Sequence, residues 1–488
     1  MKDFNNTLID NDRKSLFFRR TKIIASAGPA SSSEEMIEQL IRKGVNVFRI
    51  NFSHGLADEH LIVIERIRMI SEKINMPVAV LGDLCGPKVR VGKFKNDGVC
   101  ISVGKEVNIT VEDIIGDENI IPSQYKGLVK EVNINDKILL DDGKLELKVL
   151  SKDEKFVRAI VIRGGILKNN KGMNLPDTEM NIAALTEKDK NDALYCIKGK
   201  VDYIALSFVR KAADINDLKN LLKCNNADIP IIAKIEKPEA LVNINEILEI
   251  SDGIMIARGD LGVEMPPQQV PIIQNKLIQR ANQFNKPVIV ATQMLESMIE
   301  NSRPTRAEVT DVAGACTAGA DAVMLSGETA VGAFPLETVE FMDSILRETE
   351  SYLFFSTGGN FRTYEKLAND ELNFAIGKSV SQLAKDLMIR CIIVKTNSGY
   401  TAKMLASDRP SAPVIAFTFD INTYRELNLI WGVYPYLLSE KNKENYMVQG
   451  EKILKDLNLA QKGDHTIVIS RAGKIDLYAN IIEIHKIK

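Results

Sequence analysis

Short runs of apolar residues alternate with amphipathic stretches along the first two thirds of the chain. The runs are rich in β-branched residues and lack strict polar alternation, which is typical of strands covered on both faces. Helical patterns lie between most of them, as in Ser33–Lys43, where serines precede Glu34 and Glu35. The predicted buried strands are Thr21–Ser26, Val45–Ile50, Val78–Leu81, Val201–Leu206, Ile229–Ile235, Gly253–Ala257, Pro287–Ala291 and Asp321–Leu325. Strands and helices in this order predict an α/β fold, a closed (β/α)8 TIM barrel rather than an open sheet.

One connection interrupts this rhythm. The third predicted strand ends near Asp83 and the fourth begins near Val201, a gap far longer than an ordinary barrel loop. Strand patterns and turn signals fill its middle: Glu106–Val111, Lys137–Leu140, the hairpin signal Asp142-Gly143, Leu145–Leu150 and Phe156–Ile162. We predict that residues 88–176 form an inserted small β-barrel cap domain, with hinges near 88–92 and 172–176. A cap over a barrel mouth is well placed to exclude water from chemistry there.

A third unit follows the barrel pattern. Glu371–Met388 has a helical pattern, and Cys391–Thr396, Val414–Phe417 and His465–Ser470 are typical of buried strands. We therefore predict a C-terminal α/β domain over residues 351–488, a candidate regulatory domain. The barrel then comprises residues 19–87 and 177–350, after an N-terminal extension of residues 1–18.

Composition narrows the class of protein. The chain has 488 residues, and 63 Lys and Arg against 65 Asp and Glu give a net charge of −2, which argues against a nucleic-acid partner. No apolar run is long enough to span a membrane, and the N-terminus has no secretory signal pattern. The six cysteines are scattered without a C-x-x-C pair, as expected of reduced thiols in the cytoplasm. Phosphate-binding glycine loops are also missing, so any bound nucleotide must be held by basic side chains and a metal.

Polar residues follow the ends of the predicted barrel strands. Because the carboxyl ends of parallel strands share one rim, these side chains are expected to converge there. They are Arg49-Ile50-Asn51-Phe52-Ser53-His54-Gly55, Asp83, Ser207, Lys234-Ile235-Glu236, Arg258-Gly259-Asp260, Thr292-Gln293 and Ser326-Gly327-Glu328. Contact with solvent at any strand end would explain one or two of them, and an active site explains the whole set.

Two carboxylates from neighbouring strands stand out. Glu236 and Asp260 offer oxygen ligands of the kind that Mg²⁺ prefers. Lys234 lies two residues before Glu236, so both side chains point to the same side of a strand. A cation beside a carboxylate-bound metal suits a site that stabilises phosphoryl and enolate oxygens. The alternative is a structural Lys–Glu pair.

Seven segments in order resemble the pyruvate kinase family, over a span from about Thr21 to Thr418. The inserted domain matches by position more than by sequence. The segments are Thr21-Lys22-Ile23-Ile24 with Gly28-Pro29-Ala30-Ser31, Arg49 to Gly55, Ala233-Lys234-Ile235-Glu236, Ala257-Arg258-Gly259-Asp260-Leu261-Gly262, Ala291-Thr292-Gln293-Met294-Leu295-Glu296-Ser297-Met298, Arg303-Pro304-Thr305-Arg306-Ala307-Glu308 and Met324-Leu325-Ser326-Gly327-Glu328-Thr329-Ala330.

The resemblance implies phosphoryl transfer from phosphoenolpyruvate to ADP, giving pyruvate and ATP. It also implies a homotetramer. It implies that Glu236 and Asp260 hold Mg²⁺ or Mn²⁺ and that Lys234 stabilises the transferred group and the enolate. Arg49 matches the phosphate-binding arginine, and Thr292 matches a hydroxyl in the network that protonates the enolate. The remaining matches are Ala257, Gly259 and Asp260 in the substrate carboxylate pocket, and Pro29, Asn51, His54, Arg90 and Lys171 at the nucleotide.

One departure from the family concerns monovalent cations. Many members bind K⁺ at positions matching Asn51, Ser53, Asp83 and the backbone of Leu84, with a glutamate where this chain has Lys88. An ammonium at that position supplies a positive charge and repels a nearby cation. The sequence therefore predicts that K⁺ is not required; the alternative is that Lys88 points away and K⁺ still binds.

Other departures concern regulation. The turn Thr396-Asn397-Ser398-Gly399-Tyr400-Thr401 resembles the family's effector loop and could hold a phosphorylated effector, although a plain strand–turn–helix connection has a similar composition. The C-terminal segment Ser470-Arg471-Ala472-Gly473-Lys474-Ile475 differs from the longer effector-closing segments of many members, and Gly314 stands where asparagine is usual.

Two other functions compete with phosphoryl transfer. A metal-dependent barrel lyase or aldolase acting on an enolpyruvate-type substrate would share Arg49, Glu236 and Asp260, but gives no reason for the cap or Lys234. A non-catalytic scaffold on the same fold would be signalled by loss of a metal carboxylate or of Lys234, and all of these are present.

Overall fold

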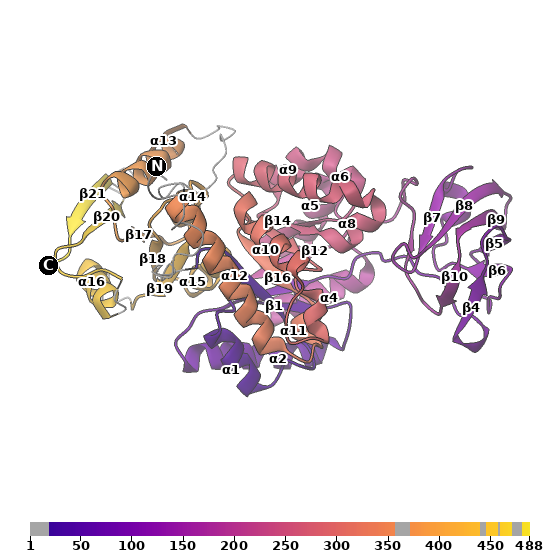
Figure 1. Ribbon diagram of the computed structural model, residues 1–488, viewed down its shortest axis with the longest axis horizontal. Coiled ribbons are helices and arrows are strands. Elements are labelled where there is room, and N and C mark those ends of the chain that lie inside the picture. Colours follow the sequence, from indigo (N-terminus) through magenta and orange to yellow (C-terminus); the bar gives the residue numbers. More distant parts are fainter. Residues whose placement is uncertain (1–18, 357–370, 440–445, 457–458, 471–480) are drawn as a thin grey trace, which may run out of the picture.

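The computed structural model describes residues 19–356, 371–439, 446–456, 459–470 and 481–488. The N-terminal extension and residues 471–475 of the C-terminal segment noted above lie outside this range. Figure 1 shows three units in a row, with the barrel in the middle, the β-rich insert on one side and the C-terminal domain on the other.

The central unit is a closed barrel of parallel strands, in the order β1-β16-β15-β14-β13-β12-β3-β2. The strands are β1 (Lys22–Ser26), β2 (Val47–Asn51), β3 (Ala79–Asp83), β12 (Tyr203–Leu206), β13 (Ile231–Ile235), β14 (Gly253–Ala257), β15 (Val288–Ala291) and β16 (Ala322–Leu325). Every predicted barrel strand is present, and the predicted fold class is confirmed.

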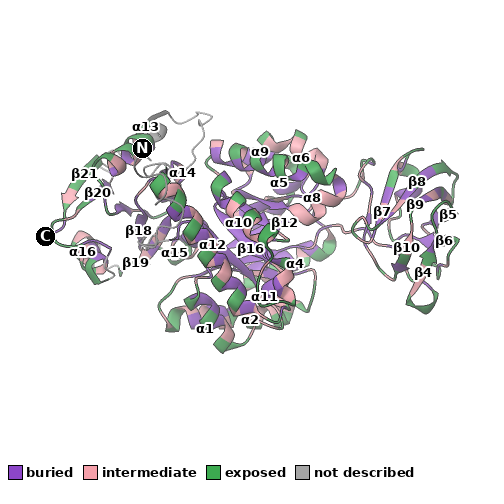
Figure 2. Ribbon diagram, in the orientation of Figure 1, coloured by how far each residue is buried: buried purple, intermediate pink, exposed green. Residues whose placement is uncertain are grey.

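Helices surround the barrel. They are α1 (Glu34–Arg42), α2 (Ala57–Lys73), α4 (Glu187–Lys198), α5 (Ala212–Cys224), α6 (Pro238–Val242), α7 (Ile244–Ile250), α8 (Arg258–Glu264), α9 (Val270–Gln283), α10 (Arg306–Ala318), α11 (Gly327–Ala330) and α12 (Pro335–Ser356). The predicted start of α1 is confirmed, because the Ser33 side chain accepts a hydrogen bond from the Met36 N–H. In Figure 2 the strands are buried, and the helices expose their outer faces. No helix of the described residues is long and apolar enough to cross a bilayer.

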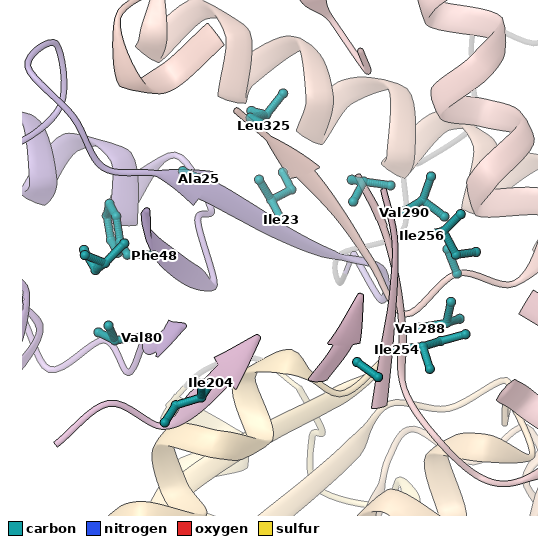
Figure 3. Packing of buried hydrophobic residues seen from close by; sticks show 14 of the residues in the cluster. Ile23, Ala25, Phe48, Val80, Ile204, Ile254, Ile256, Val288, Val290 and Leu325 are labelled. Carbon is teal, nitrogen blue, oxygen red and sulfur yellow. The ribbon is translucent and has the colours of Figure 1, made fainter. Parts of the chain in front are cut away.

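Side chains along each barrel strand alternate between two hydrophobic clusters, as the two-residue repeat of a strand requires. One cluster packs the strands against the surrounding helices; Figure 3 labels its members Ile23, Ala25, Phe48, Val80, Ile204, Ile254, Ile256, Val288, Val290 and Leu325. The intervening residues fill the barrel: Ile24, Val47, Ala79, Leu81, Tyr203, Ala205, Ile232, Met255, Ile289, Ala291, Ala322 and Met324. This alternation also decides which polar side chains point into the mouth of the barrel.

The insert between β3 and β12 has its own core, and most of its regular elements are strands. Its elements are β4 (Gly98–Ile101), β5 (Glu106–Thr110), β6 (Ile120–Pro122), α3 (Leu128–Glu131), β7 (Lys137–Leu140), β8 (Leu145–Lys152), β9 (Phe156–Arg163), β10 (Gly165–Lys168) and β11 (Met173–Asn174). They form a six-stranded sheet, β11-β7-β8-β9-β5-β6, and a two-stranded sheet, β10-β4. The predicted hairpin at Asp142-Gly143 joins β7 to β8.

The C-terminal domain is a five-stranded sheet with helices. Its elements are α13 (Glu371–Asp386), β17 (Ile392–Lys395), α14 (Tyr400–Ser407), β18 (Val414–Thr418), α15 (Ile421–Glu426), β19 (Val433–Leu437), α16 (Tyr446–Asp456), β20 (His465–Ser470) and β21 (Ile481–Lys486). The strand order is β19-β18-β17-β20-β21, and β21 pairs antiparallel with β20. Strands β19 and β21 have no counterpart in the sequence prediction, because Pro435 interrupts the first and half-exposed residues make up the second.

The C-terminal domain covers the end of the barrel where the strands begin. Leu429 packs into the barrel's interior cluster, and the Tyr203 hydroxyl donates to the Glu426 carbonyl at 2.9 Å. Arg409 forms a buried ion pair with Asp321, just before β16, at 3.0 Å. The opposite end of the barrel, where the strands finish, therefore remains for the insert and the site.

Candidate active site

The strand repeat carries polar side chains into the mouth of the barrel. On β13, Ile232 belongs to the interior cluster, so Lys234 and Glu236 follow on the same side. The same two-residue alternation on the other strands points further polar side chains into the barrel: Arg49 and Asn51 from β2, Asp83 from β3, and Ser207 just after β12. Alternation alone thus brings several of the predicted rim residues together.

Lys234 is held by two buried carboxylates. Its ammonium Nζ lies 3.1 Å from Asp83 Oδ1 and 3.0 Å from Glu236 Oε1, and it donates to Ser207 Oγ at 2.6 Å. Burial alone would lower the pKa of Lys234, but the charges of Asp83 and Glu236 outweigh burial and raise that pKa above its ordinary value. Lys234 therefore stays an ammonium throughout the neutral pH range.

Asp83 also holds Arg49. The Arg49 Nε donates to Asp83 Oδ2 at 2.6 Å, and its NH1 donates to Ser26 Oγ at 3.0 Å. Burial opposes ionisation of Asp83, yet the charges of Lys234 and Arg49 outweigh it and lower the pKa of this carboxyl. One carboxylate thus fixes two cationic heads side by side, an arrangement suited to binding an anion with several oxygens.

Glu236 and Asp260 form an electrostatically strained pair. Burial raises the pKa of Glu236, and the charge of Asp260 raises it further, although Lys234 and the Phe208 N–H act in the opposite direction. A divalent cation bound by both carboxylates would remove this repulsion, so the two residues fit the predicted metal. Among the described residues no three acidic, histidine or cysteine side chains could hold a metal by themselves. The donor set therefore fits a hard cation that completes its shell with substrate oxygens and water.

Lys88 lies between the barrel and the insert. Its Nζ is 3.8 Å from Asp260 Oδ1 and 3.9 Å from Asp142 Oδ1, at the tip of the β7–β8 hairpin. The Asp141 N–H of the same tip donates to the Gly172 carbonyl at the second hinge. The positive charge of Lys88 thus faces the predicted metal carboxylate, rather than pointing into bulk solvent.

Thr292, just after β15, contacts the segment that follows the neighbouring strand β14. Ala257 and Ala291 are register partners on β14 and β15, and both are buried. Just beyond them, the Gly259 N–H donates to Thr292 Oγ1 at 2.8 Å, and the Thr292 hydroxyl donates to the Ala291 carbonyl at 2.6 Å. The predicted substrate pocket and the predicted proton-delivering hydroxyl are therefore in direct contact.

The residues predicted to match the monovalent-cation site lie at the ends of β2 and β3. Asn51 and Asp83 are register partners, and the Asn51 side-chain oxygen accepts from the Ser53 N–H at 3.1 Å. The Leu84 carbonyl already accepts from the Ser207 hydroxyl at 2.7 Å. Asp83, the charged member of this set, is neutralised by Arg49 and Lys234.

The predicted nucleotide residues come from both sides of the mouth. Pro29 and His54 are exposed on the barrel, and the His54 carbonyl contacts the His60 ring nitrogen at 2.8 Å. Arg90 and Lys171 come from the two chain segments that connect the insert: Arg90 donates to the Asn170 carbonyl at 3.1 Å, and Lys171 pairs with Asp141 at 2.8 Å. Asn51 is the one member of the set that faces into the barrel.

The predicted effector loop is a tight turn between β17 and α14. Thr396 Oγ1 accepts from the Gly399 N–H at 3.0 Å, and Gly399 has a positive φ of 75°. The Asn397 carbonyl accepts from the Thr423 hydroxyl at 2.7 Å, while Asn397, Ser398 and Tyr400 are exposed. Both sequence interpretations of this turn fit its geometry. At Gly314 an added Cβ would meet open space, so the structure assigns no packing consequence to that departure.

Three contacts at the mouth were not assigned from the sequence. Ser207 was seen as a strand end but not as a partner of Lys234, and Asp142 was seen as a hairpin signal but not as a neighbour of Lys88. Ser26, which bonds Arg49, carried no motif. Both serines lie two residues after an interior residue of their strand, Ile24 on β1 and Ala205 on β12, and this spacing could have predicted that they face the site.

A (β/α)8 barrel whose mouth gathers fixed cations, a carboxylate pair and a β insert defines a barrel enzyme for an anionic, metal-bound substrate. Comparison with known proteins gives the family. The signature of the pyruvate kinase barrel domain matches residues 18–339, and that of the pyruvate kinase alpha/beta domain matches residues 374–485.

Individual relatives agree with these matches. A pyruvate kinase of Sporosarcina psychrophila is 43% identical over 458 residues, covering 93% of this chain and 78% of the relative. Pyruvate kinase 2 of Synechocystis is 41% identical over 478 residues, covering 96% and 79%. The crystal structure of a pyruvate kinase from Cryptosporidium parvum superposes with a TM-score of 0.89 at 33% identity, covering 96% of each chain. The chain belongs to the pyruvate kinase family, whose members are phosphotransferases that use a divalent metal.

Proposed function

We propose that this chain transfers the phosphoryl group of phosphoenolpyruvate to ADP, giving pyruvate and ATP, with Mg²⁺ or Mn²⁺ as its divalent cofactor. The observation that carries the proposal is the cluster in which Asp83 holds Arg49 and Lys234 together beside Glu236. Phosphoryl transfer has a largely dissociative transition state, which asks for positioning and charge neutralisation more than for covalent help. Two fixed cations beside a metal carboxylate meet that requirement.

Arg49 and Lys234 have different roles toward the phosphoryl group. The planar guanidinium of Arg49 binds phosphate oxygens, and its orientation is fixed by Asp83 and Ser26. The Lys234 ammonium neutralises charge on the moving group and on the enolate oxygen left behind. Because the pKa of Lys234 is raised by its carboxylate neighbours, the charge is present before substrate arrives.

Glu236 and Asp260 are the residues that would hold the metal, and their mutual repulsion supports this assignment. When bound, the divalent ion supplies positive charge to substrate oxygens. The backbone around Ala257, Gly259 and Asp260 would receive the substrate carboxylate, and Thr292 would take part in protonating the enolate.

Pro29, Asn51, His54, Arg90 and Lys171 would contact ADP. The last two belong to the connections of the insert, so movement of the insert would bring them toward a nucleotide bound at the rim. The same movement would exclude water, which otherwise competes with ADP as the phosphoryl acceptor.

A coupled assay tests the proposal directly. The protein is incubated with phosphoenolpyruvate, ADP and Mg²⁺, and pyruvate is detected through lactate dehydrogenase. We expect pyruvate formation that depends on both ADP and Mg²⁺. Pyruvate formed without ADP would indicate transfer of the phosphoryl group to water instead of ADP. No pyruvate formation from phosphoenolpyruvate would reject the proposal and favour the lyase or the scaffold hypothesis.

We further propose that the reaction does not require K⁺. Asp83 already has two cationic partners, and Lys88 adds an ammonium beside Asp260. Replacing K⁺ by tetramethylammonium at constant ionic strength is expected to leave the rate unchanged. Lys88→Glu restores a carboxylate that can attract a cation, so we expect its rate to rise with K⁺. Strong activation of the unaltered protein by K⁺ would contradict the proposal.

A homotetramer is proposed on the family resemblance, and an open sheet edge supports association. Among the described residues β21 is an edge strand that pairs with β20 alone and exposes Ile481, Ile482 and Ile484, so its other edge is available to pair with another chain. Light scattering tests the assembly, and a monomer at assay concentration would contradict it. A cytoplasmic location is proposed as well, supported by six cysteines that are all free; recovery of the protein in a membrane or secreted fraction would argue against it.

The loop Thr396–Thr401 is proposed to bind a phosphorylated effector. Its exposed backbone turn and hydroxyls are of the kind that bind phosphate, and its last two residues, Tyr400 and Thr401, form the start of helix α14. Titration with a panel of sugar phosphates, followed by calorimetry, tests the site. Equal heats for the unaltered protein and for a Ser398→Glu variant would support the plain connecting turn instead.

A further inference from the structure

Thr292 and Gln293 have an unusual backbone. Their φ angles are 69° and 54°, in the left-handed region that residues other than glycine rarely adopt. For a β-branched residue such as Thr292 this conformation is especially unfavourable, and it persists only where surrounding contacts determine it. A side chain that contacts both residues is therefore expected to hold the turn.

Arg258 makes those contacts. It follows directly after Ala257, the register partner of Ala291, so it lies beside the turn that begins at Thr292. Its NH2 donates to the Thr292 carbonyl at 2.7 Å and to the Gln293 carbonyl at 3.1 Å, and its Nε reaches the Thr292 carbonyl at 3.3 Å. One guanidinium therefore holds the carbonyl oxygens of both left-handed residues.

The guanidinium is itself fixed from the other side. Its NH1 lies 2.6 Å from Asp311 Oδ2 on α10 and donates to Gln274 Oε1 on α9 at 3.4 Å. The Arg258 side chain is 10% exposed, so it has little freedom to move elsewhere. The chain of contacts thus runs from α10 through Arg258 to the backbone that carries the Thr292 hydroxyl.

We propose that Arg258 is a positioning residue for protonation of the enolate, acting through the backbone of Thr292 and Gln293. The inference rests on the proposed function. The proton leaves the hydroxyl network of Thr292, a C–H bond forms at the methylene carbon of the enolate to give the methyl group of pyruvate, and water returns a proton to the network.

The position of the Thr292 hydroxyl depends on the backbone that the Arg258 guanidinium holds at two carbonyl groups. The Thr292 hydroxyl accepts from the Gly259 N–H and donates to the Ala291 carbonyl. With the backbone held by Arg258, redirecting the hydroxyl proton toward substrate needs only rotation about the Cβ–Oγ bond. If the turn relaxed from its left-handed conformation, the oxygen itself would move, and small misplacements of a reacting group are costly to the rate.

Exchange of the pyruvate methyl protons with D2O, followed by NMR in the presence of Mg²⁺ and inorganic phosphate, isolates this step from transfer to ADP. Arg258→Lys keeps a positive charge near Asp311 but cannot hold two carbonyl groups with a planar fork. We expect exchange to fall about 10- to 100-fold, while KM for phosphoenolpyruvate changes by less than about threefold. Arg42→Lys, which alters an exposed arginine–glutamate pair on α1, is the matched control.

Two further variants make the test decisive. In a Thr292→Ala background Arg258→Lys should have little additional effect on exchange, because the group that it positions is gone. Asp311→Asn, at a partly exposed position, loosens the guanidinium without removing it and should reduce exchange to a smaller extent.

The outcomes separate the two proposals. Normal exchange in Arg258→Lys, together with loss of exchange in Thr292→Ala, would overturn the positioning role and leave the proposed function standing. Fully additive losses in the double variant would also overturn it, because they indicate a general structural role. Normal exchange in Thr292→Ala would remove the hydroxyl's role and this inference with it. Absence of any transfer to ADP in the unaltered protein would instead reject the proposed function.

Discussion

Two buried lysines at opposite ends of the same barrel behave in opposite ways. Lys234 enters the mouth from β13, where Asp83 and Glu236 raise its pKa. Lys22 lies at the start of β1, where its Nζ donates to the Val433 carbonyl at 2.7 Å and faces the Tyr434 ring at 4.5 Å. Burial lowers the pKa of Lys22 to about 7, and the charge of Arg19 acts in the same direction.

The difference lies in the counter-charge. Both side chains are removed from water, but within the described part of the chain only Lys234 has carboxylates in direct contact. A carbonyl dipole and an aromatic face are weaker partners for an ammonium than two carboxylates. The mouth therefore keeps a permanent positive charge for its substrate, whereas the closed end carries a lysine that titrates near neutral pH.

The largest expected effect comes from removing the charge at the mouth. Lys234→Met should lower kcat at least about 10²- to 10³-fold, the usual loss for one transition-state donor. The coupled assay measures it, with exposed Lys276→Met on α9 as control. Near-normal turnover would show that Lys234 does not stabilise the transferred group.

A smaller effect is expected when one counter-charge is removed. Asp83→Asn frees Arg49 and withdraws one of the two charges that raise the pKa of Lys234. We expect kcat to fall about 10- to 100-fold near neutral pH and to fall further as pH rises, because the Lys234 ammonium then loses its proton more easily. A pH–rate profile checks this, with exposed Asp113→Asn as control. If kcat falls by the same factor at every pH, Asp83 acts by orienting Arg49 and not by keeping Lys234 protonated.

At the closed end the expected effect is on stability and not on the rate. The folded-state pKa of Lys22, about 7, lies below the ordinary value of 10.5, so between these pH values the unfolded chain binds more protons than the folded one. Lys22 should therefore make the free energy of unfolding rise with pH, by at most about 1.4 kcal/mol per pH unit. Below pH 7 the slope should vanish, because the lysine is protonated in both states.

Lys22→Met should remove that slope. Urea unfolding of the unaltered protein and the variant at pH 6, 8 and 9.5 gives the difference in free energy directly, again beside Lys276→Met. A constant difference across this range would mean that Lys22 keeps its ordinary pKa, and the contrast between the two barrel ends would then fail.

The order of the strands and the residues that enter the barrel were largely predictable. The apolar runs located all of the barrel strands, and the two-residue repeat from Ile232 to Lys234 and Glu236 follows from the sequence alone. Strands β19 and β21 were missed because Pro435 and half-exposed residues weaken the pattern of a buried strand. Periodicity reports a strand only where burial is regular.

Contacts across the mouth were less predictable. The resemblance placed Asp83 in the set that matches a monovalent-cation site, but it did not show that Asp83 pairs with Arg49 and Lys234. The resemblance included Lys88 in the same set, but it did not show that the Lys88 ammonium lies near Asp142 and Asp260. Such pairings depend on which strands become neighbours and on how the insert sits, and residue spacing encodes neither.

By itself, the sequence determined the barrel, the β insert, the shared side of Lys234 and Glu236 on their strand, and the resemblance that names the family. The tertiary structure alone decided that Asp83 links two cations, that Arg258 contacts the left-handed turn at Thr292, and that the Val433 carbonyl accepts a hydrogen bond from Lys22. Periodicity is a local property of the chain and can be read along it. Electrostatic environment is a property of neighbours brought together by closure of the barrel, so the same lysine side chain acquires opposite pKa shifts at its two ends.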